Sequence, residues 1–202
     1  MYQVLLVTRG IDHPTYAGRK ILIRSLMEIE GIKFDHVGSL EQLPNDFKKF
    51  KALVLYFHEQ QISDAAMALF GQYVSDGGGV LALHSATASF LDNPHYFEVL
   101  GGRFKQHGPI EKFRLKPVVG TKVFKGFQSF VVEDELYVHD LQPGITLHFT
   151  ALNENKEIPM VWTHRFGKGR VCYAVPGHRP ETMCHPDYQN LLRQGLSWVM
   201  GA

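Results

Sequence analysis

Several histidines in this sequence lie just after apolar segments. His58, His84 and His178 each follow an apolar run closely, and His13 lies in the polar loop after a run near the start. An imidazole can act as a general acid or base near neutral pH, and it can bind a metal ion. Ligands bind beyond the carboxyl ends of strands in an open α/β sheet, so we expect these side chains to meet at one edge of such a sheet. The alternative for each is an ordinary surface or space-filling histidine.

The clearest of these strand ends lies at residues 77–86, with the sequence GGGVLALHSA. Glycines tolerate unusual backbone angles, and the apolar run 80–83 is typical of a strand buried on both faces. His84 and Ser85 follow at its carboxyl end. We interpret His84 as a general acid or base and Ser85 as a substrate contact. The alternative is that Ser85 caps the next helix and His84 fills space.

Adjacent carboxylates at Asp134 and Glu135 form a second candidate centre. Neighbouring side chains of a strand point to opposite faces, so only one of the two enters a pocket unless a turn or bulge intervenes. Tyr137 shares a strand face with Glu135, which favours Glu135. A glutamate beside an imidazole can act as its partner in proton transfer or can orient the ring. The alternative is a solvated acidic turn.

Two further histidines lie in segments that we expect to be loops. His107 lies in the basic loop 103–109, which could hold an anionic or polyhydroxylated ligand. His178 follows Gly177, which would let the backbone pass close to a ligand. The alternatives are an exposed basic loop and a tight turn with a surface histidine. His148 lies on the polar side of an alternating strand and is set aside.

The composition suits one domain, residues 1–202, with a substantial core, since 45% of the 202 residues are hydrophobic. The 21 basic and 20 acidic residues give a formal net charge of +1, which offers no electrostatic signal for nucleic acid or an anionic membrane. No segment approaches the roughly 18 apolar residues of a membrane span, and the N-terminus lacks a secretory pattern. Cys172 and Cys184 form no metal or redox spacing. We expect a cytoplasmic protein with reduced thiols.

The pattern of apolar residues predicts an α/β fold. Strands at 2–8, 34–37, 51–57 and 80–83 alternate with helices after Thr15 and after Ser63, which indicates a parallel sheet covered by helices. The helix after Ser63 is expected to bury Ala66, Leu69, Phe70 and Tyr73. The second half is rich in strand-like segments and should extend this sheet in antiparallel or mixed fashion before a closing helix; these segments are 110–119, 130–139, 145–152, 158–166 and 171–175.

Several common catalytic motifs are missing. The triple glycine precedes its strand, so it is not a dinucleotide-binding fingerprint, and the sequence has no Walker loop and no HExxH. Ser85 is not in a G-x-S-x-G elbow.

Taken in order, a set of short motifs resembles the trehalose-utilisation (ThuA-like) family. The early Asp12-His13 is also similar to a histidine in that family's first loop. The matching segments are residues 77–86, the L-G-G-x-F-x-x-H of 100–107, the D-E-x-Y of 134–137, the P-M-V-W of 159–162 followed by G-K-G-R-V at 167–171, and Gly177-His178.

The resemblance implies a flavodoxin-like fold of the class I glutamine amidotransferase-like superfamily. True amidotransferases of this fold carry a nucleophilic cysteine in the turn that here holds His84 and Ser85, so glutaminase chemistry should be absent. Members of the family are associated with the utilisation of disaccharides, including oxidised (keto) sugars.

Our leading hypothesis is a carbohydrate-processing enzyme that uses histidine and glutamate acid–base chemistry. His84 is the general acid or base with Glu135 as its partner, and His178 or His107 polarises a sugar hydroxyl or carbonyl. The predicted substrate contacts are His13, His58, Ser85, Asp134 and Tyr137.

Two other hypotheses stay open at this point. Three imidazoles and a carboxylate would suit zinc in a metallohydrolase, although no cofactor is indicated by a local motif. The chain could instead be a non-catalytic sugar-binding protein on an amidotransferase-like fold. The candidate partners are a small-molecule sugar, a sugar oxidoreductase that would supply an oxidised substrate, and a second copy of the chain.

Overall fold

The first half of the chain alternates strands and helices. The structure is a computed structural model and describes residues 1–9, 16–153 and 156–201. The elements of this half are β1 (Tyr2–Val7), α1 (Tyr16–Leu26), β2 (Ile32–Val37), the 3-10 helices η1 (Leu40–Gln42) and η2 (Phe47–Lys49), β3 (Ala52–Leu55), α2 (Asp64–Ser75), β4 (Gly79–Leu83), the 3-10 helix η3 (His84–Ala88) and α3 (Pro94–Leu100). The second half contains β5 (Gly102–Pro117), β6 (Phe130–Leu141), β7 (Thr146–Asn153), β8 (Lys156–Phe166), β9 (Gly169–Ala174), α4 (Pro180–Cys184) and α5 (Pro186–Met200).

Within the described residues the strands form one sheet in the order β2-β1-β3-β4-β9-β8-β7-β5-β6. The neighbours β2-β1, β1-β3, β3-β4 and β4-β9 pair in parallel. The remaining neighbours, β9-β8, β8-β7, β7-β5 and β5-β6, pair in antiparallel fashion. The predicted architecture, a parallel N-terminal half with a mixed extension, is therefore confirmed. β3 and β4 are buried along their whole length, as expected for strands covered on both faces.

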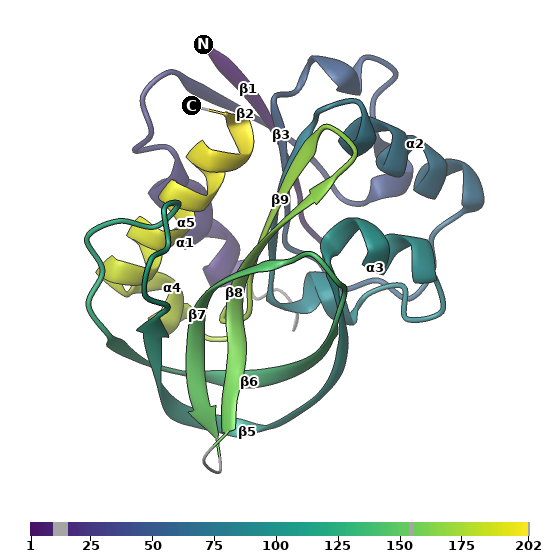
Figure 1. Cartoon of the computed structure of the whole chain (residues 1–202). Helices are drawn as coiled ribbons and strands as arrows, with labels where there is room; N and C mark the ends of the chain where they lie inside the picture. Colours follow the sequence, from purple (N-terminus) through teal and green to yellow (C-terminus); the bar gives the residue numbers. More distant parts are fainter. Residues whose placement is uncertain (10–15, 154–155, 202) are drawn as a thin grey trace.

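Helices cover both faces of the parallel part of the sheet. Figure 1 shows α1, α4 and α5 on one side of the strands and α2 and α3 on the other. Ser63 caps α2, since its Oγ accepts a hydrogen bond from the Ala66 N–H at 3.2 Å. The predicted inner face of α2 is wrong at Leu69, which is 48% exposed. Leu69 directly precedes Phe70 and so lies about 100° around the helix from that buried ring.

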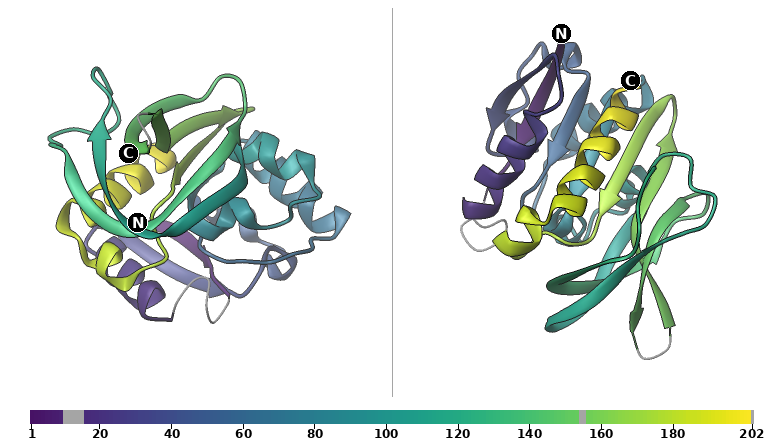
Figure 2. Two further views of the ribbon diagram at one scale, coloured as in Figure 1. Left: turned by 90° about the horizontal axis from the view of Figure 1, so that it is seen from below. Right: turned by 90° about the vertical axis from the view of Figure 1, so that its left-hand side faces the viewer.

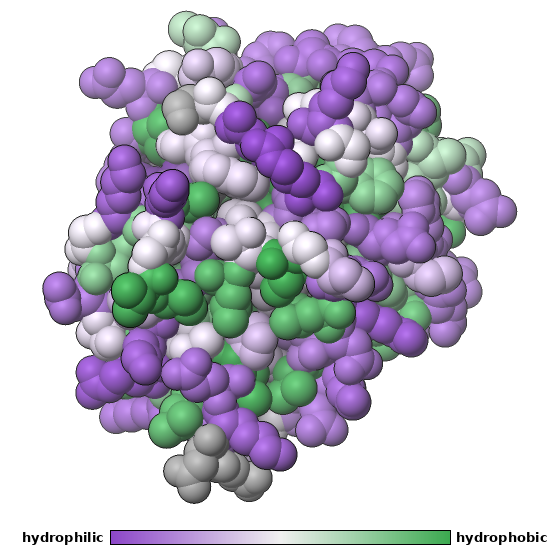
Figure 3. Space-filling model, in the orientation of Figure 1, coloured by the Kyte–Doolittle hydropathy of each residue, from purple (hydrophilic) through white to green (hydrophobic). Residues whose placement is uncertain are grey.

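The antiparallel half extends beyond the helical layers. Figure 2 shows β5–β8 projecting past α5, and the long pair of β5 and β6 crosses the carboxyl ends of the parallel strands (Figure 1). Hydrophobic side chains are visible across this region in Figure 3, with hydrophilic ones around them. Its exposed large hydrophobic residues include Ile110, Val131 and Leu152.

The prediction of a loop at 103–109 is wrong, because these residues belong to β5. They pair with β6 through two register shifts, between Phe104 and Gln106 and between His107 and Ile110. The segment is largely exposed and its alternation is broken by these bulges, so it lacks the pattern of a half-buried strand. Among the described residues, no helix has the length and apolar composition needed to cross a membrane.

Candidate functional site

His84 lies at the turn between β4 and η3 in a conformation that few side chains adopt. Its φ angle is +45°, in the left-handed region, and its ring is completely buried. Nδ1 lies 3.0 Å from the carbonyl oxygen of Val175. A carbonyl only accepts hydrogen bonds, so Nδ1 carries the proton and the other ring nitrogen, Nε2, is directed at the rest of the site.

A tyrosine hydroxyl and a carboxylate lie beside this nitrogen, and two more imidazoles lie beside the carboxylate. Nε2 of His84 lies 3.2 Å from the Tyr137 hydroxyl and 3.4 Å from Oε2 of Glu135. Nδ1 of His178 lies 3.5 Å from the same Glu135 oxygen, and Nδ1 of His107 lies 3.9 Å from Oε1. We call these five residues the Glu135 cluster. The convergence of His84, His107, Glu135 and His178 at the carboxyl edge of the sheet agrees with the sequence-based expectation.

The Glu135 cluster is buried on one side and open on the other. The exposed fraction of the side chain rises from 0% at His84 through 9% at Glu135 and 24% at His178 to 39% at His107. A ligand would therefore reach His107 and His178 first. Burial by itself raises the pKa of Glu135, but the close His84 ring and the three imidazole charges outweigh it and lower this pKa to about 2.

The ring of Tyr137 forms one wall of the cluster. It stacks on His107 with ring centroids 5.2 Å apart and lies against His84 at 4.4 Å. Burial, and then the negative charge of Glu135, raise the pKa of Tyr137, so its hydroxyl keeps its proton. It can donate that proton in a hydrogen bond to Nε2 of His84.

Asp134 points away from Glu135 and is completely buried, so the alternative of a solvated acidic turn is wrong. Its Oδ1 accepts from the main-chain N–H groups of Glu135, Gly177 and His178 at 2.9, 3.3 and 3.0 Å. Its Oδ2 accepts from the N–H of Arg179 at 3.1 Å. The carboxylate thus holds the 176–179 loop, from which His178 reaches Glu135.

Two buried tyrosines hold the carbonyl groups of the same loop. The Tyr56 hydroxyl donates to the oxygen of Gly177, and the Tyr188 hydroxyl donates to that of Pro176. A Cβ atom at Gly177 would lie 2.7 Å from Cβ of His84. The loop is therefore fixed by Asp134 and the tyrosines, and its packing on His84 requires glycine at 177.

The other predicted substrate contacts lie in different surroundings. Ser85 is 1% exposed, and its Oγ has no hydrogen-bond partner among the described residues. His58 is exposed at the end of β3 and lines a surface cavity with Arg9 and Glu59. His13 lies outside the described residues.

The sequence did not predict the buried hydrogen-bond network of Thr87, His139 and Tyr173 that supports the main chain at His84. The Tyr173 hydroxyl donates to the His84 carbonyl at 2.8 Å and lies 2.7 Å from Oγ1 of Thr87. Thr87 also contacts Nε2 of His139 at 2.9 Å. Burial lowers the pKa of His139 to about 3, so this ring is neutral and serves as support. Trp162 is fully buried and is therefore a core residue.

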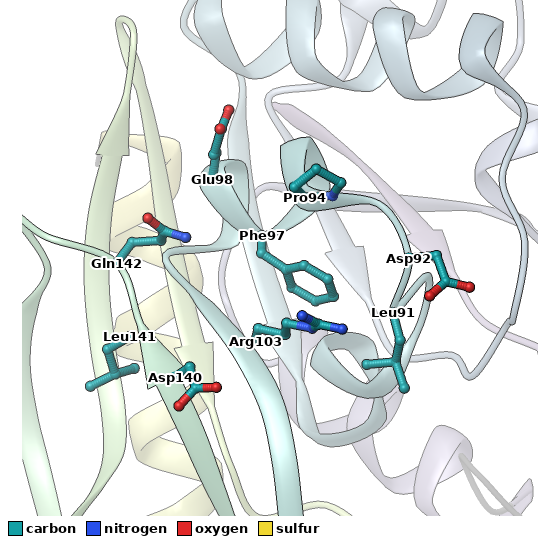
Figure 4. Close-up of a pocket in the computed structure, with 9 residues that line it drawn as sticks. All are labelled: Leu91, Asp92, Pro94, Phe97, Glu98, Arg103, Asp140, Leu141 and Gln142. Carbon is teal, nitrogen blue, oxygen red and sulfur yellow. The ribbon is translucent and has the colours of Figure 1, made fainter.

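A cavity of about 570 Å³ lies further along the same pair of strands. Its walls include Arg103 on β5 and Asp140 on β6, which pair with each other, whereas His107 pairs with Tyr137. Figure 4 shows the Arg103 guanidinium beside the Phe97 ring. No residue of the Glu135 cluster lines this cavity.

A comparison with models of known protein families identifies the family of this chain. Residues 3–199 match the model of a family described as "ThuA: Trehalose utilisation". The chain belongs to the ThuA family. No curated protein matches the chain.

Solved structures share the ThuA fold at low sequence identity. A ThuA-like protein from Parabacteroides merdae aligns with a TM-score of 0.85 and 20% identity, covering 98% of this chain and 90% of the other. A Salmonella typhimurium protein described as cytoplasmic gives 0.74 and 13%, covering 98% and 99%. A β-galactosidase from Rahnella sp. R3 gives 0.73 and 12%, but this chain spans only 31% of it.

Proposed function

We propose that the Glu135 cluster is the catalytic centre of an enzyme that processes a carbohydrate, either a disaccharide or a keto-sugar. The proposal rests mainly on one observation. A buried carboxylate lies within 3.4–3.9 Å of three imidazoles, and two of these imidazoles are partly exposed. Side chains with these properties can exchange protons with a hydroxyl or carbonyl group of a bound sugar.

His107 is the group that we assign to proton exchange with the sugar. It is the most exposed imidazole of the cluster, and Tyr137 holds its ring in place by stacking. Oε1 of Glu135 lies 3.9 Å from Nδ1 of His107, so the carboxylate can orient this ring. Such proton transfer typically contributes about a hundredfold to ten-thousandfold in rate.

The sequence assigns the general acid or base to His84, and that assignment stays a prediction. Because the His84 ring is fully buried behind the other members of the cluster, a bound sugar would not touch it. We therefore propose that His84 acts through Glu135 as a positioning residue, with its own ring fixed by the Val175 carbonyl.

Glutaminase chemistry is not part of the proposal. The turn after β4 carries His84, whereas Cys172 lies in β9 and Cys184 ends α4. Both cysteines are free. We propose that the protein works in the cytoplasm, where thiols stay reduced, and that a sugar oxidoreductase supplies an oxidised substrate.

The test is turnover of trehalose, other disaccharides and their keto derivatives, followed by product analysis. Glu135→Gln removes the negative charge at nearly constant shape, and Glu111→Gln, at an exposed position of β5, is the matched control. We expect the first variant to lose at least a hundredfold in kcat and the second to match the wild type. Full turnover by Glu135→Gln would contradict the proposal. Saturable sugar binding without turnover by the wild type would favour the non-catalytic alternative.

A further inference from the structure

We infer that His84, Glu135 and His178 bind a divalent zinc ion. Each residue offers one ligand atom, and these atoms all lie within 4.8 Å of one another. The inference goes beyond the proposed function, because metal binding can be measured without any substrate.

The spacing of the three residues suits a shared cation better than direct hydrogen bonds. The two nitrogen–oxygen distances to Oε2 of Glu135 are 3.4 and 3.5 Å. A hydrogen bond between an imidazolium and a carboxylate is shorter, at about 2.7–2.9 Å. Two ligand atoms that each lie about 2.1 Å from a tetrahedral zinc ion are about 3.4 Å apart.

The proton on His84 is on the side that metal binding requires. Its Nδ1–H donates to the Val175 carbonyl, so Nε2 presents a lone pair toward Glu135 when the ring is neutral. A metal-binding histidine commonly donates its other N–H to a carbonyl or carboxylate in this way, and the contact fixes the ring.

The environment of Oε2 of Glu135, between the imidazoles, also favours a bound cation. Oε2 of Glu135 is buried and has no hydrogen-bond partner among the described residues. A buried carboxylate oxygen is costly unless a donor or a cation compensates it. A zinc ion between His84, Glu135 and His178 would compensate this oxygen.

The ligands are held by rigid surroundings, as a preformed site requires. His84 is fixed by its turn, and His178 by the loop that Asp134 holds. Two histidines and one glutamate form a known catalytic zinc set, in which a further position is left for water or a substrate oxygen. His107 is close to Glu135 and partly exposed, so it stays available for proton exchange.

The test is zinc titration of chelator-treated full-length protein, with a competing chromophoric chelator. We expect one zinc ion per chain, and at least a tenfold weaker affinity in Glu135→Gln and in His178→Gln. The matched control is His185→Gln, because His185 is also partly exposed and lies near a carboxylate, Asp187. Circular dichroism of each metal-free variant confirms its fold. X-ray absorption of the zinc form should show nitrogen and oxygen ligands at about 2.0–2.2 Å, two of them imidazoles.

Two results would overturn the inference. One is the absence of stoichiometric zinc binding by the folded wild type. The other is unchanged affinity in folded Glu135→Gln and His178→Gln. Zinc binding without turnover of any sugar would refute the proposed function and leave this inference standing. Sugar turnover by a wild type that binds no zinc would do the reverse.

Discussion

Replacement of Asp134 should reveal how strongly the site depends on this buried carboxylate. Four main-chain N–H groups donate to Asp134, and three of them belong to the loop that carries His178. A hydrogen bond to a charged group contributes about 1.5–3 kcal/mol, and such contributions are not additive. Asp134→Ala leaves these N–H groups without their acceptor, and a buried donor left unsatisfied costs about 1–3 kcal/mol, so we expect a total destabilisation of about 3–5 kcal/mol.

Asp134→Asn removes one of these four hydrogen bonds, whereas Asp134→Ala removes all four. An asparagine oxygen in the place of Oδ1 can still accept from Glu135, Gly177 and His178, but its NH₂ group would then face the N–H of Arg179. One buried donor left without an acceptor costs about 1–3 kcal/mol, and we expect a destabilisation of about 2 kcal/mol. The flipped amide would be worse, because NH₂ would face three donors.

Urea denaturation measures these free energies of unfolding. Amide hydrogen exchange reports on the loop directly, and the amides of Gly177, His178 and Arg179 should exchange faster in Asp134→Asn. The matched control is Asp140→Asn, at an exposed carboxylate that pairs with Lys105 at 3.3 Å and should change stability by less than about 1 kcal/mol. Wild-type stability and wild-type loop exchange in Asp134→Asn would refute this explanation of the loop.

Other substitutions test neighbouring parts of the structure. Gly177→Ala would place Cβ 2.7 Å from Cβ of His84. We expect the free energy of unfolding in urea to fall by about 1–3 kcal/mol and zinc binding to weaken. An unchanged zinc affinity would contradict the close packing of the 176–179 loop on His84. Burial lowers the pKa of His148 to about 4, below its value of about 6.5 in the unfolded chain, so the folded state binds fewer protons. The contribution of neutral His148 to the free energy of unfolding should therefore be fully present above pH 6.5. It should fall by up to about 3 kcal/mol as the pH is lowered to 4, and His148→Gln should make this decline less steep. Burial also raises the pKa of Cys172 to about 12, so a thiol reagent should modify only the exposed Cys184 until the protein unfolds.

The parallel sheet could be predicted because its central strands, β3 and β4, are short and wholly apolar. Once such strands are placed side by side, their carboxyl ends share an edge, and His84 and His178 follow two adjacent strands, β4 and β9. The approach of Glu135 and His107 could not be derived from the strands alone, because it depends on how β5 and β6 cross this edge. The order of the family motifs supported that part of the prediction.

The sequence carries little information about partners that come from distant segments. Asp134 looks like an acidic surface residue until the amides of the 176–179 loop surround it. His148 lies on the polar side of its strand in the sequence pattern, yet it is only 1% exposed in the structure. The hydroxyls of Thr121 and Thr163 lie 2.6 and 2.8 Å from its ring nitrogens and satisfy them. Neither set of contacts has a local pattern, and each forms only when separate elements pack together.

Nuclear magnetic resonance of the histidine rings, during titration with trehalose and with its keto derivative, shows directly whether a sugar binds at the Glu135 cluster. If the Glu135 cluster is the site, the sugar that binds should shift the imidazole signals of His107 and His178, which are the partly exposed members of the cluster. The signals of His148 and His95 should stay unchanged. Saturable binding that leaves His107 and His178 unchanged and instead shifts the amides of Phe97 and Arg103, beside the cavity in Figure 4, would contradict the account.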